Sequence, residues 1–293
     1  MFKEYLRSKK NQVEEALNVI LPPAAGYGSV MFEAMRYSVF ASGKRLRPCL
    51  FLATLEALGK HSANFLPFAA ALEMIHTYSL IHDDLPAMDN DDLRRGKPTC
   101  HKVYGEAQAI LAGDALLTYA FNAMLQVRPF TKEGLLLDAV DEVAASAGIK
   151  GMVIGQVADI LWEGKVLSRE EMEFIHLHKT GALFRASIIS AAYLGEADEV
   201  QRVALTEYAY QLGLAFQITD DILDIVGDEA KLGKPIGSDA KNTKTTYPAL
   251  YGLEEAKKLA FVAANRAKTA LEPLGAKAEM LKNFPSYFVN RDN

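Results

Sequence analysis

Residues 64–84 read NFLPFAAALEMIHTYSLIHDD. Ala, Leu, Ile and Met dominate this stretch, and these residues favour a helix. Polar residues recur within it at spacings of three or four, so they share one face of the predicted helix; they are Glu73, His76, Ser79 and Asp83. The other faces are apolar, as in a helix that is buried on most sides. A polar face on such a helix fits an internal cavity better than a solvated surface.

A second segment, residues 198–225, repeats this pattern. It reads DEVQRVALTEYAYQLGLAFQITDDILDI. Its polar or small residues again fall on one helix face; they are Tyr210, Gly213, Gln217, Asp220 and Asp224. Both segments end in a group of carboxylates, which a merely solvated stripe does not explain. The two segments therefore predict a cavity with an acidic end.

The rest of the chain predicts more helices, with Gly and Pro mostly between them. The predicted helices span 2–20, 29–41, 45–59, 64–84, 105–126, 133–148, 150–162, 169–194, 198–225, 247–272 and 277–283. The stretch GMVIGQVADILW at 151–162 has some strand character, but a lone strand cannot form a sheet, so we predict a helix there. Neither a linker nor a low-complexity stretch divides the chain. We expect one all-α domain over residues 1–293.

Composition limits the function. Half of the 293 residues are hydrophobic, and the net charge is -5, with 37 acidic against 32 basic residues. This balance argues against nucleic acid or an anionic membrane as a general partner. The two cysteines, Cys49 and Cys100, have no metal-ligand spacing. The N-terminus has no signal-peptide pattern, and we expect no membrane span and a cytoplasmic location.

Two carboxylate clusters end the two polar faces. The first is HDDLPAMDNDD at 82–92, where Pro86 disfavours further helix and lets the chain turn Asp89 back towards Asp83. In the second, DDILD at 220–224, a helix stacks Asp220 and Asp224. Crowded carboxylates repel unless a cation compensates. Oxygen ligands suit Mg²⁺, which keeps open positions for phosphate oxygens. One cluster alone could equally be a helix cap or a solvated charge run; two clusters favour metal ions on a phosphorylated substrate.

Basic clusters accompany the acidic ones. GKRLRP at 43–48 opens a helix, RRGKP at 94–98 follows the first acidic cluster, and GKPIGSDAKNTKTTYP at 233–248 follows the second. Cations at a helix N-terminus oppose its dipole unless an anion binds there. Any one of these basic clusters, taken by itself, could serve only to keep the protein surface soluble. Together, in an acidic protein, they predict phosphate clamps.

These motifs resemble those of the trans-prenyl diphosphate synthases. HDDLPAMDNDDLRRGKPT is similar to the first aspartate-rich motif of that family, and QITDDILD is similar to the second. GKRLRP, Gly155-Gln156, Lys179-Thr180 and the run at 233–248 also match in type and order. The resemblance extends from about residue 30 to the end and is strongest to bacterial farnesyl diphosphate synthases. It implies an isoprenoid-synthase helical bundle around a deep central cavity, one polyprenyl synthase domain and a homodimer.

The resemblance also implies roles for individual residues. About three Mg²⁺ ions bind with the substrate diphosphate, and their ligands are Asp83, Asp84, Asp89, Asp220 and Asp224. Isopentenyl diphosphate is held by Lys44, Arg47, His76 and Arg95. The allylic diphosphate is held by Arg94, Lys179, Thr180, Gln217, Lys234 and Lys244. Among these, the catalytic residues that direct oxygens at the reacting carbon are Lys179, Thr180 and Gln217.

The reaction implied is head-to-tail condensation of isopentenyl diphosphate with dimethylallyl and geranyl diphosphates to (2E,6E)-farnesyl diphosphate. It proceeds by Mg²⁺-assisted ionisation, condensation and elimination. Charge on the leaving diphosphate is stabilised by the metal ions and the basic clamps. Ser79 lies four residues, about one helical turn, before Asp83, and Tyr78 lies five residues before it. An aromatic residue there implies a floor that stops the chain at fifteen carbons.

Other functions stay open to different degrees. A geranylgeranyl diphosphate synthase shares every motif and differs in product length. A non-catalytic partner subunit usually lacks one aspartate cluster, and this chain has both. A class I terpene cyclase has Asn and Ser or Thr in its second motif and lacks GKRLRP. A di-iron bundle needs two Glu-x-x-His pairs, and Glu73 with His76 is the one match that we find.

Overall fold

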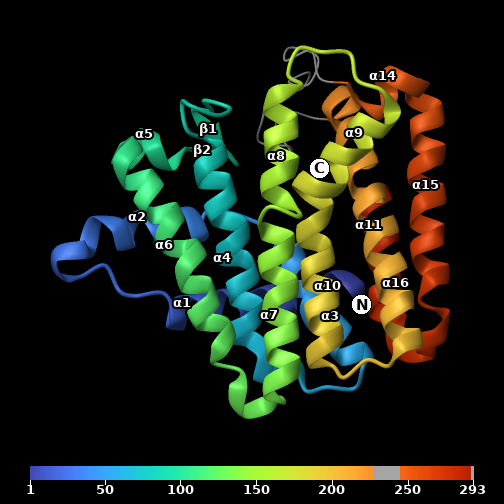
Figure 1. The fold of residues 1–293 in the computed structure, drawn as a ribbon, viewed down its shortest axis with the longest axis horizontal. Coiled ribbons are helices and arrows are strands. Elements are labelled where there is room, and N and C mark those ends of the chain that lie inside the picture. Colours follow the sequence, from blue (N-terminus) through green and yellow to red (C-terminus); the bar gives the residue numbers. More distant parts are fainter. Residues whose placement is uncertain (228–244, 292–293) are drawn as a thin grey trace. The chain divides into compact units, whose positions relative to one another are not determined.

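The computed structural model describes residues 1–227 and 245–291, and these residues are mostly helical (Figure 1). The all-α prediction is thereby confirmed. Contacts along the chain group it into two compact units. The first unit comprises Met1–Leu52 and His61–Leu136, and the second comprises Ala53–Lys60 and Leu137–Asn293. Two helices, α3 (Leu46–Ala57) and α7 (Glu133–Ala147), contain residues of both units.

In the first unit, α4 and α6 lie side by side (Figure 1). Besides the start of α3 and of α7, the elements of this unit are α1 (Phe2–Ile20), η1 (Gly26–Gly28), α2 (Ser29–Val39), η2 (Ser62–Phe65), α4 (Leu66–Asp83), β1 (Leu93–Arg94), β2 (Lys97–Pro98), α5 (Cys100–Tyr104), α6 (Glu106–Leu125) and η3 (Arg128–Phe130). Helix α4 is buried on most faces, as its composition predicts, and it has Pro67 in its first turn. It ends at Asp83, shortly before Pro86.

A small β-hairpin follows the first acidic cluster, and the sequence did not predict it. Strands β1 and β2 pair antiparallel, with Arg94 opposite Lys97. The two residues between them, Arg95 and Gly96, both have positive φ, 54° and 75°. A two-residue turn with positive φ at both positions matches the right-handed twist of a hairpin. Glycine adopts this conformation without strain. Gly96 is therefore the residue in the sequence that could have indicated this turn.

The second unit is a bundle in which α11 packs against both α10 and α15 (Figure 1). Besides the remainder of α3 and α7, its described elements are α8 (Met152–Leu161), α9 (Arg169–Ile175), the π-helix η4 (His176–Gly181), α10 (Ala182–Leu194), α11 (Glu199–Val226), α14 (Tyr247–Tyr251), α15 (Leu253–Ala270), η5 (Glu272–Ala278) and α16 (Glu279–Val289). Capping boxes begin α9 at Ser168 and α11 at Asp198. Each box satisfies two N–H groups at the start of its helix.

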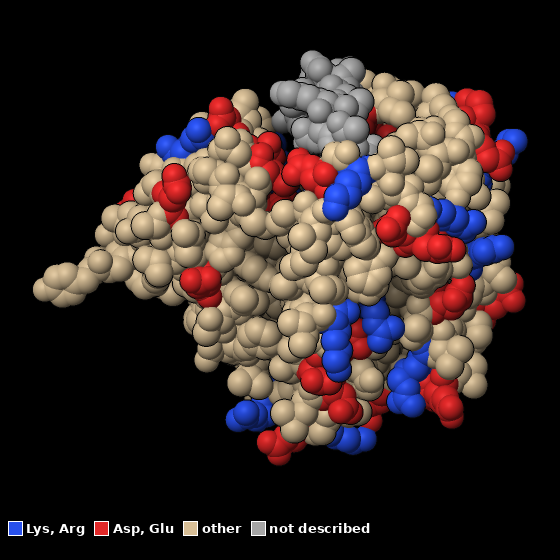
Figure 2. All heavy atoms as spheres, turned by 45° about the horizontal axis from the view of Figure 1, so that its top comes forward, with Lys and Arg blue, Asp and Glu red and all other residues tan. Residues whose placement is uncertain are grey.

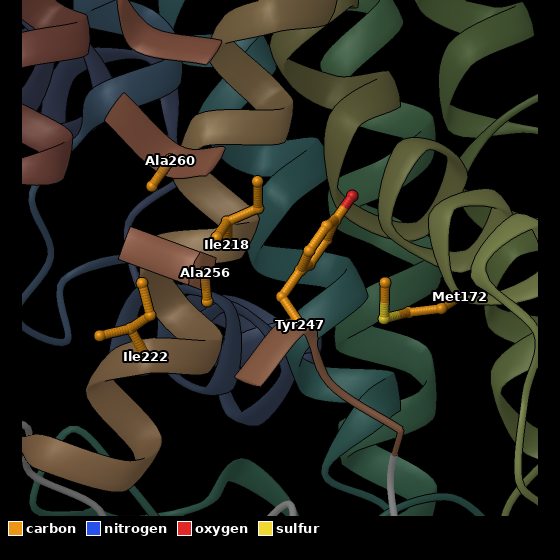
Figure 3. Close-up of a cluster of buried hydrophobic side chains, with 6 residues drawn as sticks. All are labelled: Met172, Ile218, Ile222, Tyr247, Ala256 and Ala260. Atoms are coloured by element: carbon orange, nitrogen blue, oxygen red, sulfur yellow. The ribbon is translucent and has the colours of Figure 1, made fainter. Parts of the chain in front are cut away.

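One apolar cluster of the second unit joins four helices (Figure 3). Met172 of α9, Ile218 of α11 and Tyr247 of α14 pack together, and small residues of α15, including Ala256 and Ala260, complete the cluster. The alanines let α15 lie close to α11. This packing fixes the helix that carries the second aspartate cluster.

Three predicted helices differ from the observed ones. The segment 169–194 is interrupted by the π-helix η4, and 247–272 is divided at Gly252, where φ is 80°. The last helix was predicted to end at 283, but α16 continues to Val289 through Pro285. Phe284 and Phe288 are fully buried, and Phe288 packs against Phe184 and Phe216. This tertiary packing outweighs the missing hydrogen bond at the proline.

Two segments, Glu106–Phe130 and Glu133–Leu161, are long and apolar enough to cross a membrane by length and composition alone. The second consists of α7 and α8, which are separate helices too short to span a bilayer. The first contains α6, which buries Ala109, Ala112 and Leu116. In each segment, 39% of the most apolar stretch is buried in this structure.

Candidate active site

On the face drawn in Figure 2, acidic and basic side chains of the described residues are interspersed. The charges that act on a ligand must therefore come from local clusters.

The first aspartate cluster forms a tight turn at the end of α4, in the first unit. The Asp89 N–H donates to the Asp83 carbonyl oxygen over 2.9 Å. This turn returns Asp89 to Asp83, as the sequence predicted. Asp83 is half-buried and Asp89 is exposed. The two residues are therefore held together by backbone contact.

Asp84 points to the hairpin. Its carboxylate is almost fully buried, and Arg94 Nε donates to Asp84 Oδ1 over 2.6 Å. Burial raises the pKa of Asp84, while the hydrogen bond and charge of Arg94 oppose that shift. Arg94, which we assigned to the allylic diphosphate, thus pairs with a predicted metal ligand.

The GKRLRP segment is anchored by a buried ion pair. Arg45 Nη1 lies 2.6 Å from Glu73 Oε1, and both side chains are at most 2% exposed. Arg45 Nη2 also donates to the Val39 carbonyl oxygen over 2.6 Å. Arg45 has a φ of 52°, a backbone conformation that is costly for a residue with a Cβ. Glu73, which the sequence placed on a cavity-facing stripe, is therefore a structural partner of Arg45.

The residues assigned to isopentenyl diphosphate gather in the first unit. Burial lowers the pKa of His76 well below its usual range, and the charges of Arg47 and Arg95 lower it further. Burial also lowers the pKa of Arg47 to about 10. A Cβ on Gly43 would lie 2.5 Å from Arg95 Nη1, so any larger residue there would displace the end of the Arg95 side chain. His76 is thus neutral and Arg47 charged at pH 7, while Lys44 is exposed beside Gly43.

The two residues assigned to product length have different surroundings. Tyr78 is 7% exposed, and its ring meets the His82 ring edge-on at 5.7 Å. Burial raises the pKa of Tyr78 to about 12. The hydroxyl of half-buried Ser79 donates to the His76 carbonyl oxygen over 2.8 Å. Tyr78 therefore presents an uncharged ring at neutral pH.

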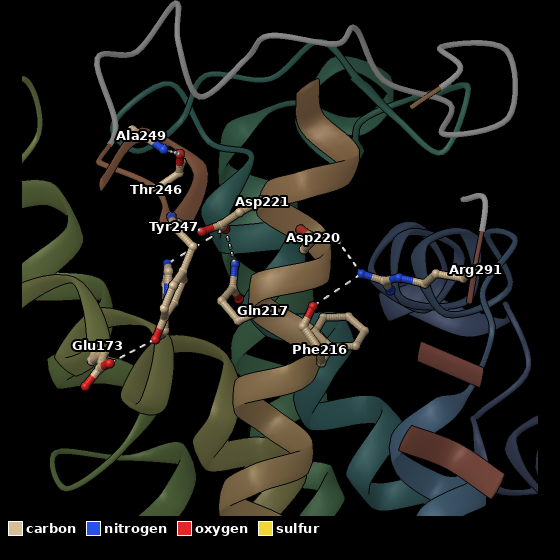
Figure 4. A network of polar contacts seen from close by, with 10 residues as sticks. Glu173, Phe216, Gln217, Asp220, Asp221, Thr246, Tyr247, Ala249 and Arg291 are labelled. Atoms are coloured by element: carbon tan, nitrogen blue, oxygen red, sulfur yellow. Dashed lines mark hydrogen bonds and ion pairs between the residues drawn. The ribbon is translucent and has the colours of Figure 1, made fainter. Parts of the chain in front are cut away.

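The second aspartate cluster lies on α11, in the second unit. Asp220 is half-exposed, and Arg291 Nη2 lies 3.0 Å from Asp220 Oδ1 (Figure 4). The guanidinium of Arg291 also covers the Phe216 ring, 4.3 Å from its centroid. Asp224 is 3% exposed. A buried cation thus already lies against one predicted metal ligand.

Asp221 differs from Asp220. It is 3% exposed, its Oδ2 accepts from the Tyr247 N–H over 3.0 Å, and its Oδ1 accepts from Gln217 Nε2 over 3.1 Å (Figure 4). Burial raises the pKa of Asp221 to about 7, although both hydrogen bonds lower it. The middle carboxylate of the motif therefore belongs to an internal network.

Lys179 and Thr180 lie in the π-helix η4, and such segments are frequent at functional sites. Two glycines allow α8 and α11 to pack closely against this π-helix. A Cβ on Gly155 of α8 would lie 2.2 Å from the Lys179 nitrogen, and a Cβ on Gly213 of α11 would lie 3.3 Å from the Gly181 Cα. Lys179 Nζ meets Asp159 Oδ2 at 2.7 Å. The backbone that carries both assigned residues is thus clamped between α8 and α11.

A cavity of about 370 Å³ lies in the second unit, between residues of α7, η4, α10 and α11. Leu177, Ala182 and Ala209 give it apolar walls, and Tyr210 also lines it. Tyr210 lies two helical turns before Gln217, so the cavity follows the same face of α11 as Gln217. The cavity shares Tyr210 with the predicted stripe, but Gln217, Asp220 and Asp224 do not line it.

The carboxylates that we assigned as ligands suit Mg²⁺ in their chemistry. All are hard oxygen donors, and guanidinium groups lie against Asp84 and Asp220. Among residues 1–227 and 245–291, no three His, Cys, Asp or Glu side chains converge on a ready-made metal site. Such a donor set suits ions that arrive with a diphosphate and take part of their coordination from it. Lys234 and Lys244 lie outside the described residues.

Several partners of these residues carry no signal in the sequence. Lys179 and Asp159 are 20 residues apart on different elements, and Arg45 and Glu73 are 28 apart. Arg291 lies 71 residues after Asp220. Asp221 is not among the ligands that the resemblance implies, and its partner Tyr247 lies 26 residues later on another helix.

Comparisons of the sequence and of the structure with known proteins all match prenyl synthases. The model of the polyprenyl synthetase family matches residues 29–281. A farnesyl diphosphate synthase of Geobacillus stearothermophilus is 54% identical over 88% of this chain and 87% of that protein. A geranylgeranyl diphosphate synthase of Cyanophora paradoxa is 47% identical over 99% of this chain and 96% of that protein. The crystal structure of an FPP/GFPP synthase from Zymomonas mobilis has a TM-score of 0.87 and 33% identity, and the match covers 99% of this chain and 100% of that one.

Proposed function

Because the chain belongs to the polyprenyl synthetase family, we propose that it is a prenyltransferase that makes (2E,6E)-farnesyl diphosphate. Its substrates are isopentenyl diphosphate and the allylic diphosphates dimethylallyl and geranyl diphosphate. The observation that carries the proposal is the high identity to a farnesyl diphosphate synthase over most of both chains. The turn that joins Asp83 and Asp89 supports it.

The reaction begins when the bond between the allylic carbon and its diphosphate breaks. Arg94, Lys179 and Lys244 hold the diphosphate as it gains negative charge. The assigned aspartates would hold Mg²⁺, which when bound would supply further positive charge to that leaving group. Thr180 and Gln217 direct oxygen dipoles at the allylic cation. The double bond of isopentenyl diphosphate then forms the new carbon–carbon bond, and the released diphosphate accepts the departing proton.

A direct test is incubation of the pure protein with isopentenyl diphosphate, dimethylallyl diphosphate and Mg²⁺. The expected product is a fifteen-carbon diphosphate. Mainly twenty-carbon product would favour a geranylgeranyl diphosphate synthase, the alternative that the second relative represents. Absence of any product would favour a non-catalytic partner subunit.

Arg47→Ala should raise KM for isopentenyl diphosphate by about 10- to 150-fold, because the loss of a charge-assisted contact costs roughly 1.5–3 kcal/mol. KM for geranyl diphosphate should change little. Lys234→Ala should show the opposite preference, since we assign that residue to the allylic diphosphate. Arg7→Ala, an exposed arginine of α1, is the control. Equal effects of Arg47→Ala on both substrates would contradict the assignment of separate sites.

Tyr78→Ala should shift the product from fifteen carbons towards twenty and longer. Removal of the ring leaves space for a further isoprene unit, whose burial contributes about 25 cal/mol per Å². Tyr78→Phe keeps the ring and should keep the fifteen-carbon product. If Tyr78 is only part of the core, truncation costs roughly 3–5 kcal/mol of stability and product length stays the same, as chain-length analysis of both variants will reveal.

We also propose that the two units form one polyprenyl synthase domain. Helices α3 and α7 contain residues of both units, which supports joint folding. Trp162, the one tryptophan, lies in the second unit, and both cysteines lie in the first and are buried. Tryptophan fluorescence and thiol reactivity should therefore change at the same urea concentration. Two separate transitions would indicate two domains.

We further propose a cytoplasmic homodimer. Helix α8 exposes several large apolar side chains, which are Val153, Ile154, Val157, Ile160 and Leu161. Exposed apolar groups of this kind mark interaction surfaces, and a second copy of the chain is the partner that the family resemblance implies. A monomeric mass by light scattering at micromolar concentration would exclude the dimer.

A further inference from the structure

We propose that Asp221 is a positioning residue that fixes the amide orientation of Gln217, so that the Gln217 carbonyl oxygen faces the allylic carbon. The inference rests on the proposed function and deepens it. It gives the middle aspartate of the second motif a task separate from that of Asp220 and Asp224.

The contacts of Asp221 carry the proposal. Both of its oxygens accept hydrogen bonds from protein donors, one from the Tyr247 N–H at 3.0 Å and one from Gln217 Nε2 at 3.1 Å (Figure 4). The residue is 3% exposed, whereas the Asp220 side chain is 44% exposed. Asp221 therefore faces into the protein, while Asp220 lies where solvent can reach it.

Tyr247, which donates a hydrogen bond to Asp221, is itself held in place by its neighbours. The Tyr247 hydroxyl donates to Glu173 Oε1 over 3.0 Å, and the Tyr247 ring stacks on the His176 ring at 5.7 Å. Tyr247 is 2% exposed and packs in the apolar cluster with Met172 and Ile218 (Figure 3). A carboxylate with such neighbours has little freedom, and supporting contacts of this kind make a site precise.

Chemistry then decides the orientation of Gln217. In the structure the NH₂ end of the amide faces Asp221, with Gln217 Nε2 donating to Asp221 Oδ1, and the carboxylate form of Asp221, which only accepts hydrogen bonds, enforces this orientation. The carbonyl oxygen, which is the negative end of the amide dipole, points the other way. An oxygen directed at the allylic carbon stabilises positive charge as the bond to diphosphate breaks, because the dipole is oriented beforehand. The reversed amide would present N–H groups and oppose that charge.

Asp221→Asn tests the proposal. The Asn oxygen can still accept from the Tyr247 N–H, but its NH₂ group now faces Gln217 and favours the reversed amide. We expect kcat to fall about 10- to 100-fold, with KM for both substrates and the Mg²⁺ concentration for half-maximal rate within about twofold of wild type. Glu170→Gln changes an exposed carboxylate of α9 outside this network and should leave kcat within about twofold.

A double-mutant cycle separates positioning from other roles. Once Gln217→Ala has removed the amide, adding Asp221→Asn should lower kcat by no more than about twofold. An equally large loss in that background would overturn the proposal, because Asp221 would act independently of Gln217. A raised Mg²⁺ requirement in Asp221→Asn would overturn it too, because Asp221 would then act on the metal.

A spectroscopic measurement on the wild-type protein covers the case in which Asp221→Asn does not fold. Gln217→Ala identifies the Gln217 side-chain amide signals in the ¹⁵N spectrum. Their two protons should be well separated and slow to exchange, since one bonds to a buried carboxylate. Overlapping, rapidly exchanging signals would overturn the positioning role. This measurement needs no turnover, so its outcome is independent of whether the proposed reaction is correct.

Discussion

Asp83→Asn and Asp220→Asn should each lower kcat by about 10³-fold or more, with the melting temperature within a few degrees of wild type. Each change removes an assigned metal ligand, and a metal ion contributes several kcal/mol to charge stabilisation at the leaving group. Asparagine keeps an acceptor for the Arg291 guanidinium beside position 220. Steady-state rates and thermal melts of each variant provide the measurement.

The control is Asp92→Asn, in the same acidic cluster, where the exposed carboxylate pairs with Lys102 at 2.7 Å. Its kcat should stay within about threefold of wild type. A chelator should likewise stop turnover of the wild-type protein without a large fall in melting temperature. Near-normal kcat in either Asp83→Asn or Asp220→Asn would mean that the ligand assignment is wrong.

Gly155→Ala should destabilise the protein by about 3 kcal/mol or more and lower kcat as well. The new Cβ would lie 2.2 Å from the Lys179 nitrogen and 2.7 Å from the His178 carbonyl carbon. These are backbone atoms, so no side-chain rotation can relieve the clash. The π-helix must move, and Lys179 and Thr180 move with it. The expected fall in melting temperature is roughly 10 °C.

Gly134→Ala is the matched control for this substitution. Gly134 also lies in a helix, α7, and a Cβ there meets nothing within 4 Å. This change should be neutral or stabilise by up to about 1 kcal/mol, since alanine is the better helix former. If Gly155→Ala melted like Gly134→Ala, the close approach of α8 to the π-helix would be wrong.

Local rules predicted much of the fold. Composition and periodicity located most helices, and Pro86 correctly ended α4 and allowed the turn from Asp83 to Asp89. These features depend on residues that are neighbours in the chain. The local sequence is therefore sufficient to predict them.

Features that depend on distant partners could not be predicted. Glu73 has the spacing of a cavity-lining residue, but Arg45 draws it into a buried ion pair. The π-helix has a wider turn than an α-helix, and hydrophobic periodicity does not report that difference. Likewise, Asp221 and Asp220 are identical in type, and their separate surroundings follow from the packing of Tyr247 and Arg291.

The two halves of α3 find their neighbours at different times during synthesis on the ribosome. The residues just beyond α3 meet the end of α10, where Lys60 pairs with Glu196, 136 residues later in the chain. At about 5–20 residues per second, translation of that stretch takes roughly 7–30 s. Leu58, whose side chain lies against Gly195 at the end of α10, must wait for this partner. The nascent chain thus exposes an apolar helix end for seconds, a natural binding site for a chaperone.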